Sequence, residues 1–301
     1  MNCIETTNLS HRFSDGNMVL DNINLQIPSG SIYGFLGPNG AGKTTTLKLI
    51  LGLLKKQEGS ITVFGKVFET NRIEILRNLG SLIETPSLYG HLTAAENLEI
   101  LQKVYQCPKK RIFEVLEIVG LEHTKNKKTS QFSLGMKQRL SIAMSLLHSP
   151  SLLILDEPTN GLDPNGIIEM RELLKRLNNV LGMTIVISSH LLSEIEKIVT
   201  HVGILHKSSL MFQGTLSDLQ FQQKLGAKTS FVTNDLEKTL HIIHSNGYSA
   251  KLIDEQITLQ ETDSKIISEL NETLVNNRIK VFQINTIKND LESIFIDLVN
   301  N

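Results

Sequence analysis

Short, uninterrupted runs of apolar residues stand out in the hydrophobic pattern of the chain. Such runs occupy residues 31–36, 151–155 and 184–189, and each has the length of a single strand. Runs without polar alternation are typical of parallel strands that are buried on both faces. We therefore expect an α/β fold with an open sheet, in which the further run at 202–206 is the last strand.

Other segments follow the two periods of regular secondary structure. Residues 2–36 favour short strands separated by turns, and residues 60–64 favour another strand. Apolar residues recur at helical spacing in residues 71–79, 91–148 and 166–181. Thr93 and Glu96 have the spacing of a capping box, which predicts the start of a helix.

The pattern changes near residues 220–228, where glutamine and lysine predominate and we expect a linker. The strands expected beyond it are 229–232, 248–252, 256–259 and 280–284, and the helices are 236–245 and 264–276. This β-α-β-β-α-β order predicts a small two-layer α+β domain. Leu291, Ile294, Phe295 and Leu298 predict a final amphipathic helix. The region shows no cluster of catalytic residues, and packing, dimer contact and regulation are all open as its role.

The sequence Gly-Pro-Asn-Gly-Ala-Gly-Lys-Thr at residues 37–44 matches the pattern G-x-x-x-x-G-K-T of a phosphate-binding loop. A predicted strand precedes it and a predicted helix follows, as the pattern requires. Glycines let backbone N–H groups converge on one anion, and the N-terminus of the helix adds a favourable dipole. Lys43 can reach the β- and γ-phosphates of a nucleotide, and Thr44 can bind Mg²⁺. The residues expected to contact nucleotide here are Gly37, Pro38, Asn39, Gly40, Ala41, Gly42, Lys43, Thr44 and Thr45.

Ionisable residues follow two of the buried runs, at the strand ends where open α/β sheets bind ligands. Asp156 and Glu157 come directly after the run at 151–155. Because burying two like charges is costly, they suggest a carboxylate that binds magnesium beside a second acid. His190 follows the run at 184–189, and we expect it to contact phosphate from the same edge.

Two further residues have a functional and a structural interpretation. Glu84 follows the strand-like residues 79–83, so it is either an active-site carboxylate or a solvated loop residue. Phe13 precedes a predicted turn, so it either stacks on a nucleotide base or belongs to the core of a hairpin.

Composition narrows the class of protein. Thirty basic and 31 acidic residues give a net charge of −1, so no nucleic-acid partner is expected. No uncharged apolar run approaches the roughly 18 residues of a membrane span, and the first residues do not resemble a secretion signal. Cys3 and Cys107 are too few for a disulfide framework, which favours a cytosolic protein with reduced thiols.

Taken in order, residues 2–220 resemble the ATP-binding subunit of ATP-binding-cassette (ABC) transporters. The matching motifs are Walker A at 37–44, Walker B with its catalytic glutamate at 151–157, the D-loop with Asp163 at 160–163, the switch histidine His190, and the adenine-stacking aromatic Phe13. The resemblance implies an ABC ATPase domain over residues 1–220, with a mixed sheet, a β subdomain and a helical subdomain, followed by the small domain at 229–301.

Two motifs depart from the family pattern. The signature Leu-Ser-Gly-Gly-Gln is Phe-Ser-Leu-Gly-Met at 132–136, which keeps Ser133 and Gly135, the residues expected to touch the γ-phosphate. The usual Q-loop glutamine is Glu84, which can bind Mg²⁺ or water but lacks an amide donor. Residues 82–89 resemble the subfamily that exports bacitracin-type and lantibiotic peptides and confers self-immunity, and that subfamily carries this glutamate.

The resemblance implies an ATPase with ATP and Mg²⁺ as ligands. Thr44, Asp156 and Glu84 are the expected metal contacts, and Glu157, His190 and Glu84 the expected catalytic residues. It implies a homodimer or a paired cassette with ATP at the interface, and a separate membrane permease as partner. We therefore expect a cytoplasmic protein, peripheral on the inner face of the membrane. The alternatives are a soluble ABC ATPase acting on ribosomes or nucleic acid, and a non-hydrolysing regulator gated by nucleotide.

Overall fold

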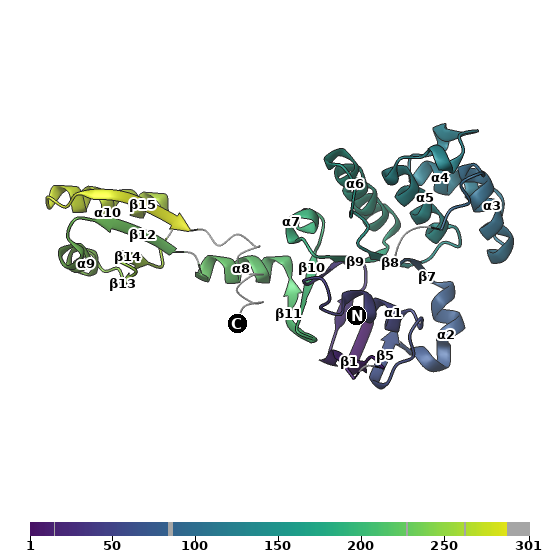
Figure 1. The fold of residues 1–301 in the computed structure, drawn as a ribbon, viewed down its shortest axis with the longest axis horizontal. Coiled ribbons are helices and arrows are strands. Elements are labelled where there is room, and N and C mark those ends of the chain that lie inside the picture. The colour runs from purple at the N-terminus through teal and green to yellow at the C-terminus, as the bar shows by residue number, and fades with distance from the viewer. Residues whose placement is uncertain (15, 84–86, 227, 262, 288–301) are drawn as a thin grey trace. The chain divides into compact units, whose positions relative to one another are not determined.

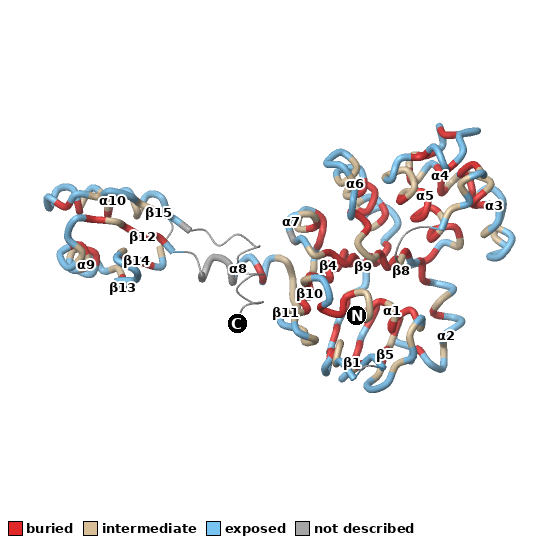
Figure 2. The backbone as a smooth tube through the Cα atoms, in the orientation of Figure 1, coloured by how far each residue is buried: buried red, intermediate tan, exposed pale blue. Residues whose placement is uncertain are grey.

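A computed structural model describes residues 1–14, 16–83, 87–226, 228–261 and 263–287 of the chain. These residues divide into two compact units, one comprising Met1–Leu216 and the other beginning at Ser217. Each unit has its own sheet and its own buried core (Figure 1, Figure 2).

The central sheet of the first unit has the strand order β11-β10-β4-β9-β8-β7. Its strands are β4 (Ile32–Leu36), β7 (Leu79–Leu82), β8 (Leu152–Asp156), β9 (Thr184–Ser189), β10 (His201–His206) and β11 (Ser209–Thr215). Neighbouring strands are parallel from β10 to β7, and every residue of β4 and β9 is buried. The apolar runs therefore form the buried parallel strands that the sequence predicts.

The prediction that residues 202–206 form the last strand of this sheet was wrong. β10 is an inner strand, because β11 pairs with it in antiparallel orientation and forms the edge. The two strands are joined at Lys207 and Ser208, both of which have positive φ angles, 43° and 67°. Tight hairpin turns of this kind usually contain glycine or asparagine, so the sequence carried no recognisable turn signal here.

A second, antiparallel sheet lies on the other side of helix α1 (Lys43–Ile50), as Figure 1 shows. Its strands are β1 (Asn2–Arg12), β2 (Met18–Ile23), β3 (Gln26–Pro28), β5 (Glu58–Val63) and β6 (Lys66–Val67). One apolar cluster joins the two sheets through the helix, since it contains Ile61, Leu47 and Phe35. The helix that follows the phosphate-binding loop is therefore fixed by core packing on both sides.

The remaining helices of this unit are α2 (Phe68–Arg77), α3 (Ala94–Tyr105), α4 (Lys110–Ile118), α5 (Leu134–Leu146), α6 (Pro164–Leu181) and α7 (Leu192–Ile195), with short 3₁₀ turns at Glu122–Thr124 and Thr129–Gln131. Helices α3, α4 and α5 pack against one another beside β7. The capping box is confirmed, because Thr93 and Glu96 exchange side-chain to backbone hydrogen bonds at the start of α3. Among the described residues, no helix combines the length and apolar character that a membrane span requires.

Helix α8 (Leu216–Gly226) occupies most of the segment for which we expected a linker. Glutamine, lysine and leucine are good helix formers, so the change in composition marked a helix and not an irregular connection. The predicted helix at 291–298 lies outside the described residues.

The second unit confirms the β-α-β-β-α-β order. Its elements are β12 (Lys228–Thr233), α9 (Leu236–Ser245), β13 (Ala250–Ile253), β14 (Gln256–Leu259), α10 (Ser264–Asn276) and β15 (Val281–Ile287). The antiparallel sheet has the order β13-β14-β12-β15. Phe231 and Ile257 face the helices and share a core with Ile243 and Leu274.

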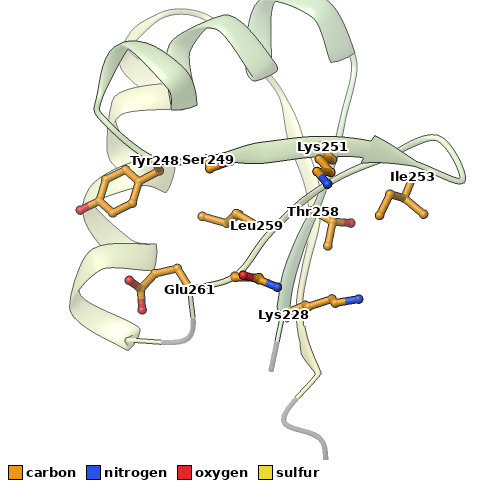
Figure 3. Close-up of a pocket in the computed structure, with 9 residues that line it drawn as sticks. Lys228, Tyr248, Ser249, Lys251, Ile253, Thr258, Leu259 and Glu261 are labelled. Atoms are coloured by element: carbon orange, nitrogen blue, oxygen red, sulfur yellow. The ribbon is translucent and has the colours of Figure 1, made fainter. Parts of the chain in front are cut away.

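The sheet of the second unit also borders a hollow of about 470 Å³ (Figure 3). Lys228, Lys251 and Thr258 line it from three neighbouring strands. Thr258 alternates with the buried Ile257 and Leu259, so it lies on the face of the sheet opposite the apolar core. This part of the hollow is therefore polar and positively charged.

A close contact in the first unit gives a prediction about stability. A Cβ atom added at Gly203 would lie 2.2 Å from the hydroxyl oxygen of Tyr33, which is fully buried and donates to Gln213. We expect Gly203→Ala to lower the free energy of unfolding by about 1–3 kcal/mol, as overpacking does. Urea denaturation measures this loss.

The Tyr33→Phe background provides the control for this prediction, because it removes the oxygen that the new methyl group meets. We expect Gly203→Ala to cost less there than in the wild type. Equal losses in the two backgrounds would show that the contact with the hydroxyl is not the cause.

Candidate active site

The loop at residues 37–42 connects β4 to α1, and other segments of the chain pack closely against it. Gly42 is the N-cap of α1 and has a φ of 105°, which side chains rarely tolerate. A Cβ atom there would also lie 2.7 Å from Leu20 and 2.8 Å from the carbonyl oxygen of Val19. Glycine at this position therefore permits both the turn and the close approach of β2.

Lys43, the first residue of α1, points back along this loop. Its ammonium group donates to the carbonyl oxygens of Gly37, at 2.8 Å, and Pro38, at 3.3 Å. It also lies 3.6 Å from a carboxylate oxygen of Glu157. Burial lowers the pKa of Lys43, and the charges of Glu157 and Asp156 oppose that shift. The loop therefore holds the positive charge of Lys43 at its centre. Its N–H groups also favour the binding of an anion.

Asp156, at the end of β8, connects the loop with the neighbouring strand. One carboxylate oxygen accepts a hydrogen bond from the hydroxyl of Thr44 at 2.8 Å. The other accepts one from the hydroxyl of Ser188 at 2.5 Å. Both oxygens of this partly buried carboxylate are therefore oriented by residues from α1 and β9.

Glu157 follows in a strained backbone conformation, with a φ of 49°. Its N–H group donates to the hydroxyl oxygen of Ser188 at 2.9 Å. Its carboxylate lies 2.8 Å from Nδ1 of His190 as well as near Lys43. The turn thus aims the second acid toward the phosphate-binding loop while the first remains with Thr44.

Lys43, Glu157 and His190 line one cavity of about 310 Å³, within the range of small-molecule sites. The lining residues are Phe13, Val19, Asn39, Gly40, Gly42, Lys43, Thr44, Thr45, Glu157, Asn160 and His190. The ring of Phe13 is 45% exposed and makes an edge contact with His11, with ring centres 5.5 Å apart. An exposed aromatic face beside the cavity fits a planar base, which was one of the two interpretations of this residue.

Some described residues predicted for the site are not among those that line this cavity, namely Gly37, Pro38, Ala41, Ser133, Gly135, Asp156 and Asp163. Ser133 is the exposed N-cap of α5, and its hydroxyl accepts the N–H of Met136 at 3.2 Å. Asp163 is the N-cap of α6, where it accepts the N–H of Gly166 at 3.0 Å. Gly135 follows Ser133 in the first turn of α5. Glu84 lies outside the described residues.

The N-terminal end of α5 and the residues that precede α6 nevertheless lie next to each other. A Cβ atom at Gly161 would lie 3.1 Å from the side chain of Leu134, and one at Gly135 would lie 3.7 Å from Leu162. The D-loop and the start of α5 therefore form one surface of the chain, from which Asn160 lines the cavity. Leu134 is 43% exposed on this surface.

Sequence reasoning missed Ser188, whose hydroxyl contacts both Asp156 and the backbone of Glu157. The available signal was its position two residues before His190, at the end of a buried run. It also missed Val19, and it assigned Asn160 to the D-loop without foreseeing that both residues line the cavity. Their roles depend on the turn after β8 and on the packing of β2 against the loop.

The donor set fits magnesium. A hydroxyl and a carboxylate, from Thr44 and Asp156, present oxygen ligands beside the phosphate-binding loop. The described residues contain no group of three histidine, cysteine or acidic side chains able to hold a metal. Magnesium bound with a nucleotide needs no such cage, because phosphate oxygens and water supply most of its ligands.

Comparison with known proteins agrees with this geometry. A family model described as "ABC transporter" matches residues 20–160. The bacitracin transport ATP-binding protein BcrA of Bacillus licheniformis is 44% identical, over 98% of this chain and 97% of that protein. The lantibiotic transport ATP-binding protein SrtF of Streptococcus pyogenes is 46% identical over 65% of this chain and 83% of its own length.

Among solved structures, the ATP-binding cassette MJ0796, in a dimeric post-hydrolysis state with ADP and Pi, superposes with a TM-score of 0.62. It is 27% identical, and the match covers 71% of this chain and 98% of that one. The long match to BcrA and the cassette fold lead to one assignment. This chain belongs to the ABC transporter family, as an ATP-binding subunit of the kind that hydrolyses ATP.

Proposed function

We propose that this ATPase powers a separate membrane permease that exports an antimicrobial peptide or a similar amphiphile, and so confers resistance or self-immunity. The observation that carries the proposal is the match to the bacitracin transport protein, which extends over nearly the full length of both chains. It thus includes the second unit as well as the cassette. The lantibiotic transport protein supports the same class of substrate.

The active form in this proposal is a pair of cassettes with ATP between them. One chain supplies the phosphate-binding loop, Glu157 and His190 to a common cavity, whereas Ser133 and Gly135 begin a helix outside it. The N-terminus of a helix carries free N–H groups and a favourable dipole for phosphate. A second cassette could place its own α5 against the open side of the cavity. The dimeric cassette with ADP and Pi is a precedent for such pairing.

Within each site, the chain's own residues have separate tasks. Phe13 stacks on the base, and the N–H groups of the loop hold the phosphates. Lys43 leaves its carbonyl partners and binds the β- and γ-phosphates. Thr44 and Asp156 hold Mg²⁺, which would neutralise the developing charge on the phosphates.

Hydrolysis then depends on the second acid. Glu157 orients the attacking water and accepts its proton, and the backbone turn and His190 fix the position of its carboxylate. His190 also contacts the γ-phosphate. Catalysis of this kind acts mainly through positioning and charge stabilisation.

The connection to the membrane is the remaining part of the proposal. Cytoplasmic segments of the permease dock beside residues 84–105, where Glu84 links the metal site to the partner. The subunit then sits on the cytoplasmic face of the membrane. The described residues contribute α3 (Ala94–Tyr105) to this surface, with Val104 69% exposed.

The first prediction concerns Glu157. The variant Glu157→Gln should bind ATP normally but hydrolyse it about 100-fold more slowly, as expected for loss of one general base. Steady-state phosphate release and equilibrium nucleotide binding separate the two effects. Glu172→Gln, an exposed acid on α6, is the matched control and should retain the wild-type rate. Near-normal hydrolysis by Glu157→Gln would exclude the proposed role.

A second prediction tests whether the site is shared. Lys43→Ala and Ser133→Arg should each abolish hydrolysis by the pure variant. An equal mixture should recover about one quarter of the wild-type rate, because about half of the randomly formed dimers are mixed and each keeps one complete site. Native mass spectrometry verifies that mixed dimers form. Mixed dimers without activity would contradict a site composed of both chains.

A third prediction concerns the partner. The tagged chain should recover a multi-span permease from detergent-solubilised membranes of its host, identified by mass spectrometry. The permease supplies the path across the membrane, so it should be enriched over an untagged control. Recovery of ribosomes or DNA without a membrane protein would instead support the soluble alternative.

A further inference from the structure

The end of β9 places a hydroxyl group between the two acids of the site. Ser188 lies directly opposite Asp156 in the parallel pairing of β9 with β8, and it is fully buried. Its hydroxyl donates to one carboxylate oxygen of Asp156 at 2.5 Å and accepts the N–H of Glu157 at 2.9 Å. Because a serine hydroxyl has a single proton to donate, these two contacts fix its orientation.

The N–H group that Ser188 holds belongs to the peptide group between Asp156 and Glu157. Rotation of that peptide group changes the φ angle of Glu157, which is 49°. A left-handed conformation is unfavourable for glutamate and persists only where the surrounding structure holds it. The hydroxyl of Ser188 therefore constrains the backbone at the point where the chain turns toward the phosphate-binding loop.

These contacts continue a series of hydrogen bonds that begins at α1. Thr44 donates to the second carboxylate oxygen of Asp156 at 2.8 Å. In order, the series comprises the hydroxyl of Thr44, the carboxylate of Asp156, the hydroxyl of Ser188 and the N–H of Glu157. Both bonds to the carboxylate are charge-assisted and so stronger than bonds between neutral groups. The series joins the two residues that we propose as metal ligands to the backbone of the acid that we propose as the general base.

The other end of the turn is anchored independently. Thr159, which is 3% exposed, donates to the carboxylate of Glu194 on α7 at 2.7 Å. Arg171 on α6 donates to the backbone carbonyl oxygen of Glu194 at 2.6 Å. Loss of the Ser188 hydroxyl would therefore release one peptide group and leave the rest of the turn attached. Ser188 thus governs the direction of Glu157 and not the existence of the turn.

We propose that Ser188 is a positioning residue for hydrolysis, whose hydroxyl holds the peptide group before Glu157 so that the carboxylate stays beside His190 and Lys43. The inference deepens the proposed function and rests on the role of Glu157 as general base. Ser188 is not among the residues that line the cavity, so it acts through Glu157 and not by contact with nucleotide. Small displacements of a reacting group are costly, which gives a buried hydroxyl behind the site a measurable effect on the rate.

The variant Ser188→Ala in the full-length chain tests the effect on the rate. Turnover at saturating ATP should fall about tenfold, because the base is no longer held in place. Equilibrium binding of ATP should be unchanged, since Lys43 and the N–H groups of the loop are intact. Ser31→Ala is the matched control, because Ser31 is also buried and donates to the carbonyl oxygen of Pro28, before the start of β4. Wild-type turnover by Ser188→Ala, or an equal loss in the control, would overturn the inference.

A double-mutant cycle shows whether Ser188 acts through Glu157. In the Glu157→Gln background, Ser188→Ala should cause little further loss, because the carboxylate that it positions has already been removed. Single-turnover hydrolysis of radiolabelled ATP measures these low rates. A second loss of about tenfold in that background would mean that Ser188 acts independently of Glu157, and it would refute the inference.

Hydrogen exchange gives a readout that does not depend on activity. In the nucleotide-free chain, Ser188→Ala should speed up exchange of the Glu157 amide, because that N–H loses its acceptor. The amides of β8 should exchange at the wild-type rate, since their partners lie in the sheet. Exchange at single-residue resolution, by NMR or by mass spectrometry with fragmentation, measures both. An unchanged rate at Glu157 would contradict the proposed constraint.

The two single variants separate this inference from the proposed function. Near-normal hydrolysis by Glu157→Gln would overturn both, because Ser188 would then have no base to position. Slow hydrolysis by Glu157→Gln together with normal hydrolysis by Ser188→Ala would overturn the inference alone and leave the general base in place.

Discussion

The parallel pairing of β4, β8 and β9 is the constraint on which the active site depends. Leu36 pairs with Ser189, and Asp156 pairs with Ser188, so the three strands end at the same level. The phosphate-binding loop, the two acids and His190 are the residues that follow these ends. Segments far apart in the sequence thus meet because the strands are buried on both faces and cannot slip without exposing apolar side chains.

One cation and two carboxylates occupy this site, and each has specific partners. Lys43 is held by its own loop and lies near Glu157, while Asp156 is occupied by two hydroxyl groups. The left-handed backbone at Glu157 stores strain at the carboxylate that we propose as the general base, as functional sites often do. A bound nucleotide would take the place of the interactions that Lys43 now makes with carbonyl oxygens. In the proposed mechanism, the site thus exchanges internal contacts for contacts with phosphate.

The second unit contributes stability and a surface rather than reactive groups. Its core is formed by one face of an antiparallel sheet and two helices, with Phe231 and Leu274 fully buried.

The sequence by itself determined the parts of the protein that depend on short-range order. The strand, loop and helix around Lys43 were predictable because glycine, lysine and threonine at this fixed spacing are typical of a phosphate-binding loop between a strand and a helix. The buried strands and the two acids after β8 were predictable because uninterrupted apolar runs suit a parallel sheet. The order of elements in the second unit followed from period and turn residues alone.

Only the tertiary structure decided what depends on contacts between distant segments. Ser188 gained its role because β9 lies beside β8, and no local pattern marks a serine for that. The β10–β11 turn was hidden because its positive φ angles occur at lysine and serine and not at glycine. The signature helix was recognisable in the sequence, but its position outside the lining of the cavity could be seen only in three dimensions.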